Sequence, residues 1–163
     1  MSRRANALAQ VGGLARMSWH ILRAHTGGPA SGGTMTLVIS HERDVMLVKP
    51  RYRRHWCLPG GWLEPSEDPL VGAAREVTEE TGLVLRRPPL LLVTHSRNNH
   101  SDHLFIGSPD HERSGRATTP WEIGATRWAP TAELDTLHPV SRGILALIPG
   151  GIEAAIDAEL KRA

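Results

Sequence analysis

The chain has 163 residues, a length that fits one domain with a sizeable hydrophobic core. Hydrophobic residues make up 40% of it, which excludes an intrinsically disordered protein, and the net charge of +2 is too small to indicate nucleic-acid binding. The single cysteine, Cys57, excludes an intramolecular disulfide and a cysteine-rich zinc site. The composition therefore predicts a folded protein compatible with the reducing cytoplasm.

The first 26 residues predict an amphipathic helix. Arg16, His20 and Arg23 interrupt each apolar run, so we expect neither a signal peptide nor a membrane span. We expect this helix to pack on the domain or on a partner. Residues 27–33 are rich in Gly, Ser and Pro and predict a linker, followed by the main domain at 34–163. The apolar side of the helix is expected to hold Leu8, Val11, Leu14, Ala15, Met17, Ile21 and Leu22.

Short apolar runs predict the strands. Residues 34–40 and 45–50 are split by a polar turn and predict a β-hairpin. Trp121, Ile123 and Trp128 are expected to anchor a later strand in the core. Strands on both sides of a central helix predict an α/β fold, with helices covering a mixed sheet. The remaining strands are expected at 89–97, 102–108 and 121–130, and C-terminal helices at 139–148 and 151–162.

The central helix follows a turn that contains Gly60 and Gly61. It is expected to begin near Asp68 and Pro69, with Ser66 as its N-terminal cap, and to end before Gly82. At 100° per residue, one side of this helix is apolar and is expected to face the core. This buried stripe consists of Leu70, Ala73, Ala74 and Val77.

Three acidic residues, Glu76, Glu79 and Glu80, lie in the sector beside the buried stripe. Like charges three or four positions apart on a helix cost about 0.2–0.5 kcal/mol per pair, and Arg75 alone cannot neutralise three carboxylates. One interpretation is a solvated acidic stripe, and the other is a Mg²⁺ site built from oxygen ligands. The preceding glycine turn favours the metal site, because it lets a backbone carbonyl or a phosphate come close.

The spacing of these residues is specific. Gly61, Glu67, Arg75-Glu76-Val77, Glu79-Glu80 and Gly82-Leu83 form the pattern G-x5-E-x7-R-E-U-x-E-E-x-G-U, where U is apolar. This pattern resembles the signature of the Nudix hydrolase family, and every defined position matches. The motif covers about a seventh of the chain, and we expect the resemblance to extend from Thr34 to about Ile148.

The resemblance implies an α/β/α sandwich around a mixed sheet and hydrolysis of a diphosphate linkage, typically in a nucleoside diphosphate derivative. It implies that Mg²⁺ is the cofactor, that Mn²⁺ can substitute, and that Glu67 pairs with Arg75 in a structural role. Divalent ions neutralise phosphate oxygens and lower the pKa of bound water, and a nearby carboxylate takes the proton. The implied metal ligands and catalytic acids are Gly60 through its carbonyl, Glu76, Glu79 and Glu80, with Gly61 and Gly82 as structural glycines.

Outside the motif, Glu122 is a candidate metal ligand or general base. If the strand alternates, Trp121 and Ile123 point into the core and Glu122 points into the cleft; otherwise it is an exposed strand carboxylate. A basic loop just before the glycine turn either holds the substrate's phosphates or is simply solvated. Its candidate phosphate ligands are Arg51, Arg53 and Arg54, beside His55.

The remaining candidates are less specific. Cys57 is expected to be a packed small residue rather than a nucleophile. A loose cluster of His95, Arg97, His100 and His103 matches no defensible zinc spacing and is at most a substrate contact. Only one Tyr and one Phe are present, so base stacking would depend on Trp62, Trp121, Trp128 or Arg.

Together these features predict a Mg²⁺-dependent hydrolase that cleaves a diphosphate linkage with metal-activated water. The alternative is a ligand-sensing or scaffold protein that keeps the fold without turnover. The segment after the motif, THSRNNH, carries none of the residues that mark known substrate subgroups, so the substrate is not specified. We expect a small-molecule diphosphate as partner, no nucleic acid and no membrane, and leave a homodimer open.

Overall fold

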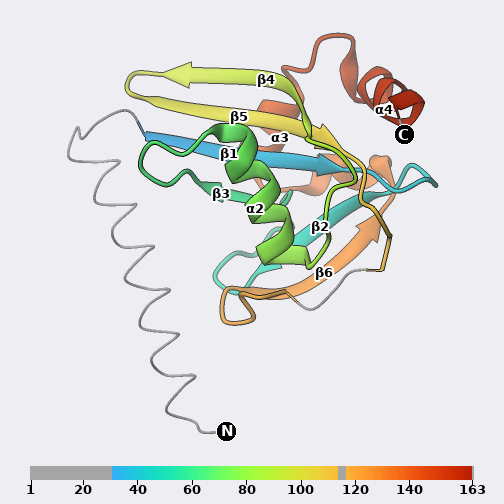
Figure 1. Cartoon of the computed structure of the whole chain (residues 1–163), viewed down its shortest axis with the longest axis horizontal. Helices are drawn as coiled ribbons and strands as arrows, with labels where there is room; N and C mark the ends of the chain where they lie inside the picture. The colour runs from blue at the N-terminus through green and yellow to red at the C-terminus, as the bar shows by residue number, and fades with distance from the viewer. Residues whose placement is uncertain (1–30, 114–116, 163) are drawn as a thin grey trace, which may run out of the picture.

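The computed structural model describes residues 31–113 and 117–162 (Figure 1). The N-terminal helix predicted at residues 1–26 lies outside these described residues. The elements are β1 Ser31–Val38, β2 Val45–Pro50, β3 Gly60–Trp62, α2 Pro69–Thr81, β4 Leu90–Arg97, β5 His100–Gly107, β6 Ile123–Ala129, the 3₁₀-helix η1 Thr131–Thr136, α3 Pro139–Leu145 and α4 Gly151–Arg162. Within the described residues, no helix is long and apolar enough to span a bilayer.

A mixed sheet forms the centre of the fold. Four strands lie in the order β3-β1-β5-β4, with β1 and β5 parallel and the other neighbours antiparallel. Strands β2 and β6 form a separate antiparallel pair. The mixed sheet predicted from the sequence is confirmed.

The prediction of a hairpin between residues 34–40 and 45–50 is wrong in its pairing. A tight turn does join the two strands, but only one bridge, Ile39 with Val45, connects them. Both edges of β1 are already occupied by β3 and β5, so β2 pairs with β6 instead. Strand β1 also begins at Ser31, so residues 31–33 of the expected linker belong to the sheet, where Gly33 pairs with both Trp62 and Asp102.

Helices cover both faces of the sheet layer (Figure 1), as the predicted α/β/α sandwich requires. The end of strand β1 and the residue that follows it alternate between the two cores. Leu37 and Ile39 pack with the C-terminal helices, and Val38 between them packs with Val77 of α2. Full burial of one such side chain contributes about 1.5–3 kcal/mol. The two apolar layers therefore hold α2 at a fixed position over β1 and β3.

The ends of α2 are set by local interactions. Asp68, not the predicted Ser66, is the cap, because its carboxylate accepts a hydrogen bond from the backbone N–H of Leu70 at 2.8 Å. Pro69 opens the helix and Gly82 closes it with a left-handed φ of 70°, as predicted. Leu70, expected in the buried stripe, is exposed, whereas Ala73 and Val77 are fully buried.

The segment before β6 differs from the prediction. The strand begins at Ile123, so Glu122 precedes it and does not lie on it. Ile123 is buried as expected, but Trp121 is 39% exposed and does not anchor the core. Trp128 does contribute to the core on the α2 side, and its indole N–H donates to the Glu112 carbonyl at 3.1 Å.

Candidate active site

The glycine turn brings β3 against the acidic face of α2. The backbone N–H of Gly60 donates to the Glu80 carboxylate at 2.9 Å. A Cβ at Gly60 would lie 2.1 Å from the carbonyl oxygen of Thr34, and a Cβ at Gly61 would lie 2.7 Å from the Glu76 carboxylate. Neither position has room for a side chain: Gly60 allows β3 to lie close to β1, and Gly61 allows β3 to lie close to α2.

Arg75 and Glu67 form the ion pair that the motif predicts. The Nε of Arg75 donates to Glu67 Oε1 at 2.8 Å, and its Nη2 donates to Oε2 at 2.9 Å. Such a forked pair fixes geometry as well as charge. The hydrogen bonds from Arg75 lower the pKa of Glu67, and Arg75 Nη2 also donates to the Trp62 carbonyl at 3.3 Å. The loop between β3 and α2 is therefore tied to the helix.

The same guanidinium also faces two further carboxylates. Its Nη1 donates to Glu76 at 2.7 Å and to Glu79 at 3.5 Å. Glu80 receives no cation: it is only 6% exposed, and its one hydrogen bond among the described residues comes from Gly60. The negative charge of this cluster therefore exceeds the positive charge within it.

The pKa values of Glu76 and Glu80 reflect their burial and this excess of negative charge. Burial raises the pKa of Glu76 to about 7, against the opposing effect of Arg75, and the charges of Glu79 and Glu122 add to the rise. Burial also raises the pKa of Glu80 well above its usual range, with the charge of Glu76 as the next cause. Without a bound cation, both groups therefore hold protons more tightly than exposed glutamates do.

Glu122 approaches the acidic cluster from the loop before β6. The last carbonyls of a helix lack partners within it, and here the Glu79 carbonyl accepts from the Thr118 N–H at 2.8 Å and from the Thr119 hydroxyl at 3.3 Å. The Tyr52 hydroxyl donates to Glu122 at 3.2 Å. The Glu122 carboxylate raises the pKa of Glu76 and Glu80, so it lies within their electrostatic reach. Its catalytic role stays a prediction.

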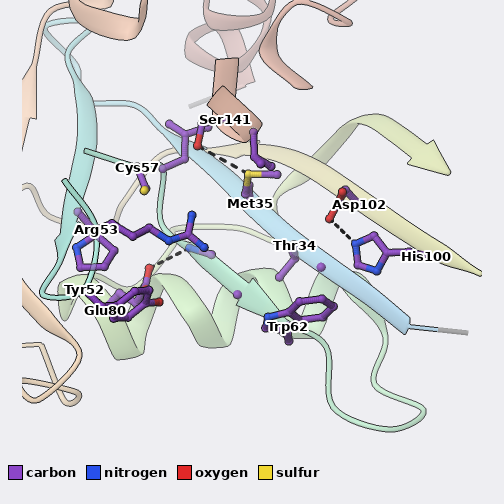
Figure 2. A pocket seen from close by; sticks show the side chains of 17 residues that line it. Thr34, Met35, Tyr52, Arg53, Cys57, Trp62, Glu80, His100, Asp102 and Ser141 are labelled. Atoms are coloured by element: carbon purple, nitrogen blue, oxygen red, sulfur yellow. Dashed lines mark hydrogen bonds and ion pairs between the residues drawn. The ribbon is translucent and has the colours of Figure 1, made fainter. Parts of the chain in front are cut away.

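A pocket of about 280 Å³ opens beside this cluster (Figure 2). Tyr52, Arg53 and Glu80 lie at one end of it, and Trp62, His100 and Asp102 lie at the other. Its size is near the lower limit of small-molecule sites, which span roughly 300–1,000 Å³. Further lining comes from Gly33, Thr34, Met35, Val48, Pro50, Cys57, Leu58, Gly60, Gly61, Val140 and Ser141.

The basic loop contributes one arginine to the pocket. Arg53 lines it and extends towards Glu80 (Figure 2). The Nε of Arg51 donates to the Pro120 carbonyl at 2.9 Å, and neither Arg51 nor Arg54 lines the pocket. The phosphate-binding prediction is therefore kept for Arg53 alone, since the other two arginines do not line the pocket.

The remaining polar candidates do not assemble. Cys57 is buried and burial raises the pKa of its thiol, which agrees with a packed residue. His100 lines the pocket, but His103 bonds to Thr94 on β4, and His95 is exposed. Among the described residues, no three His, Cys, Asp or Glu side chains are arranged as a metal site.

The donor set around Gly60 nevertheless suits a hard divalent cation. Glu76, Glu79 and Glu80 offer only carboxylate oxygens, the ligand type that Mg²⁺ and Mn²⁺ prefer. Two of these acids are turned towards Arg75, which explains why they do not already surround one point. The buried Glu80 carboxylate, with a single hydrogen bond among the described residues, is the observation that best fits a role as metal ligand.

Sequence reasoning missed two pocket residues. Tyr52 lies beside Arg53 in the basic loop and lines the pocket. An aromatic residue among arginines was the sequence feature that could have identified it. Asp102 lies among polar residues at the start of β5, where no local pattern distinguishes it, and only the strand register shows that it shares a face of the sheet with Trp62.

Comparison with known proteins identifies the family. Residues 32–148 match the family model described as the NUDIX domain. The chain belongs to the Nudix family. The Nudix fold is also that of a NUDIX hydrolase structure from Nitrosomonas europaea, with a TM-score of 0.57, 22% identity, and coverage of 71% of this chain and 67% of that one.

Two curated relatives carry specific names. A CMP-5'-(N-acetyl-N-hydroxy-3-aminopropyl)phosphonate hydrolase of Streptomyces rubellomurinus is 31% identical over 132 residues, which cover 76% of this Nudix chain and 64% of the relative. A putative 8-oxo-dGTP diphosphatase of Bacillus subtilis is 35% identical over 78 residues, 47% of this chain and 52% of the relative. The chain thus spans between half and two thirds of the length of these relatives.

The Arg75–Glu67 pair predicts a stability effect. Arg75→Lys keeps the charge but loses the forked geometry, so the metal-free protein should lose about 1–3 kcal/mol of unfolding free energy in chemical denaturation. Arg127→Lys is the matched control, because its partner Glu133 is more exposed than Glu67 (38% against 10%), and it should lose less than about 1 kcal/mol. Equal losses in the two variants would contradict the assignment.

The buried acids predict how stability depends on pH. The folded pKa of Glu76, about 7, lies above its usual 4.5, so its contribution is fully present below pH 4.5 and is lost as pH rises through 7. The loss is about 3 kcal/mol from Glu76, and Glu80 acts in the same direction. In EDTA, chemical denaturation should therefore show lower stability at pH 8 than at pH 5.

The control is the double variant Glu76→Gln/Glu80→Gln, which removes both titrating groups. Its stability should change much less over the same pH range. If both proteins show the same pH dependence, these carboxylates are not its source.

Proposed function

We propose that this Nudix chain is a divalent-metal-dependent hydrolase that cleaves a diphosphate linkage in a nucleoside diphosphate derivative or a related organic diphosphate. The buried carboxylate of Glu80, which accepts a hydrogen bond from Gly60 and has no ion-pair partner among the described residues, is the observation that supports this proposal most directly. Both curated relatives named above act, by their names, on nucleotide-type compounds. Mg²⁺ is the proposed cofactor, and Mn²⁺ is expected to substitute because it accepts the same oxygen ligands.

The metal would be held by Glu76, Glu79 and Glu80, with the carbonyl of Gly60 as a further proposed ligand. When bound, the cation neutralises the phosphate oxygens and lowers the pKa of a bound water. For Glu76 and Glu79, binding requires that their carboxylates leave Arg75, which then keeps its forked bonds to Glu67. Arg75 would thus hold the loop through Glu67 while the acids bind the cation.

The other residues of the site position the substrate and move a proton. Arg53 extends along the pocket towards Glu80 and is proposed to bind the diphosphate. Glu122, held by the Tyr52 hydroxyl, is proposed to accept the proton of the attacking water. The water oxygen bonds to one phosphorus, the bridging P–O bond breaks, and the second phosphate leaves with the bridging oxygen.

The second candidate function is a ligand sensor or scaffold without turnover. Such a protein would keep the pocket, but it would not need more negative charge around Gly60 than Arg75 can neutralise. The intact set of acids favours the hydrolase.

A substrate panel tests the proposed function. Nucleotide sugars, ADP-ribose, nucleoside triphosphates and prenyl diphosphates are incubated with Mg²⁺ or Mn²⁺ in ¹⁸O-labelled water, and products are read by mass spectrometry. At least one diphosphate should be cleaved, with label in one product and no turnover in EDTA. Binding of a compound without cleavage of any would favour the sensor.

Glu80 and Glu159 allow a matched test, because both are glutamates at 6% exposure. Glu80→Gln should lower kcat at least about a hundredfold, the scale expected for a catalytic acid or base. It should raise the stability of the metal-free protein, since an uncompensated acid is removed. Glu159→Gln should leave kcat unchanged and lower stability, because Glu159 pairs with Arg162 at 2.8 Å. The reverse pattern in kcat and thermal melts would overturn the assignment.

Glu122 and Tyr52 should act together. Glu122→Gln is expected to lower kcat at least about tenfold with little change in melting temperature. Tyr52→Phe removes only the hydrogen bond at 3.2 Å and should lower kcat less, and the two changes should not be additive. Wild-type turnover in Glu122→Gln would remove this residue from the mechanism.

A further inference from the structure

The end of the pocket away from Glu80 contains Trp62, His100 and Asp102 (Figure 2). We propose that this end binds the nucleobase of the substrate, with Trp62 as the stacking surface and Asp102 as the acceptor that selects bases bearing an exocyclic amino group. This rests on the proposed function for the diphosphate part of the ligand. The selectivity itself is tested independently of turnover.

The strand register places these side chains on one face of the sheet. Trp62 of β3 and Asp102 of β5 both pair with Gly33 of β1. Directly paired residues point to the same face, and residues two apart on a strand do so too. Asp102 therefore shares its face with Leu104, which packs in the core under α3 and α4. This is the face opposite α2.

Gly33 lies between the two residues in the sheet, and its lack of a side chain makes room for the Asp102 carboxylate. A Cβ at this position would lie 2.8 Å from Asp102 Oδ1, so the carboxylate leans over the glycine. Met35 and Ser141 line the pocket next to this space. The result is a slot with an aromatic ring at one side and a carboxylate at the other, which suits a flat polar ring.

His100 orients both recognition groups. Its ring meets Trp62 edge to face, with centroids 5.1 Å apart and an angle of 64° between the planes. Its Nε2 lies 2.9 Å from Asp102 Oδ1, and because a carboxylate only accepts, the histidine nitrogen is the donor. Within residues 31–113 and 117–162, Asp102 Oδ2 has no hydrogen-bond donor, so this oxygen is available to a ligand.

The chemistry of a carboxylate determines which bases fit. Cytosine, adenine and guanine carry exocyclic amino groups that donate to an acceptor, and acidic side chains read the N4 amino group of cytosine in this way. Uracil has a carbonyl oxygen in place of the cytosine amino group, and hypoxanthine has one in place of the adenine amino group; a carboxylate repels both. Hypoxanthine differs from guanine by having only a hydrogen in place of the C2 amino group, so it offers the carboxylate no donor there. Stacking on Trp62 strengthens binding of every base and does not distinguish them. Affinity and selectivity are thus assigned to different residues.

The base and the diphosphate fit the two ends of one pocket. Strand β3 spans both ends, since Gly60 donates to Glu80 and Trp62 follows two residues later. Two residues of strand cover about 7 Å. A nucleotide that stacks on Trp62 therefore directs its phosphates towards Glu80 and Arg53.

The test uses matched nucleotides and calorimetry. Binding of CMP and UMP, and of AMP and GMP against IMP, is measured with the full chain in Mg²⁺. The wild type should bind the amino-bearing member of at least one pair about tenfold to a hundredfold more tightly, as expected for a charge-assisted hydrogen bond. Asp102→Asn offers a donor as well as an acceptor, so this ratio should fall to within about threefold.

Two further variants separate the roles. Trp62→Ala should weaken both members of a pair by roughly tenfold and leave their ratio unchanged, whereas Trp62→Phe should bind nearly as the wild type does. Asp135→Asn, which removes the same charge from an exposed residue outside the pocket, should change neither value.

The outcomes distinguish this inference from the proposed function. Equal affinity within all pairs, or a wild-type ratio retained in Asp102→Asn, overturns the inference even if the enzyme hydrolyses diphosphates. Discrimination that depends on Asp102 supports the inference, and if no diphosphate is then cleaved, only the proposed function fails.

Discussion

One guanidinium among four carboxylates is the interaction on which the site depends. Arg75 gives two of its donors to Glu67, which leaves a single nitrogen for Glu76 and Glu79 and nothing for Glu80. Burying a carboxylate without a cation is unfavourable. Glu80 is buried in this way, and the hydrogen bond from the Gly60 N–H offsets only part of the cost. Such local conflict with the rules of stability is typical of a functional site.

The fold explains how that conflict is maintained. The two apolar layers fix α2 over β1 and β3, and Gly61 lets β3 approach the helix more closely than any side chain would allow. The loop before β6 is tied to the Glu79 carbonyl at the end of α2, which brings Glu122 to the cluster from a different part of the chain. Relaxation of the acids away from each other is therefore restricted.

The parts that the sequence predicted correctly are those governed by local spacing. The helix limits at Pro69 and Gly82 and the Glu67–Arg75 pair follow from positions within one short motif. The errors involve contacts between distant segments. Strand β2 pairs with β6 rather than β1 because β1 has no free edge, which no local pattern reveals. Likewise, Asp102 meets the site only through the register of three strands around Gly33.

The central claim is that Glu76 and Glu80 are buried acids that bind a divalent cation. The most direct test is calorimetric titration of the protein with Mn²⁺ at pH 6.5, in two buffers of different ionisation enthalpy. Metal binding to protonated ligands must release protons, and the raised pKa values of both acids predict a net release at this pH. The account predicts binding with proton release in the wild type, and weaker binding with fewer protons released in Glu80→Gln. Binding of equal strength in both proteins, without proton release, would contradict it.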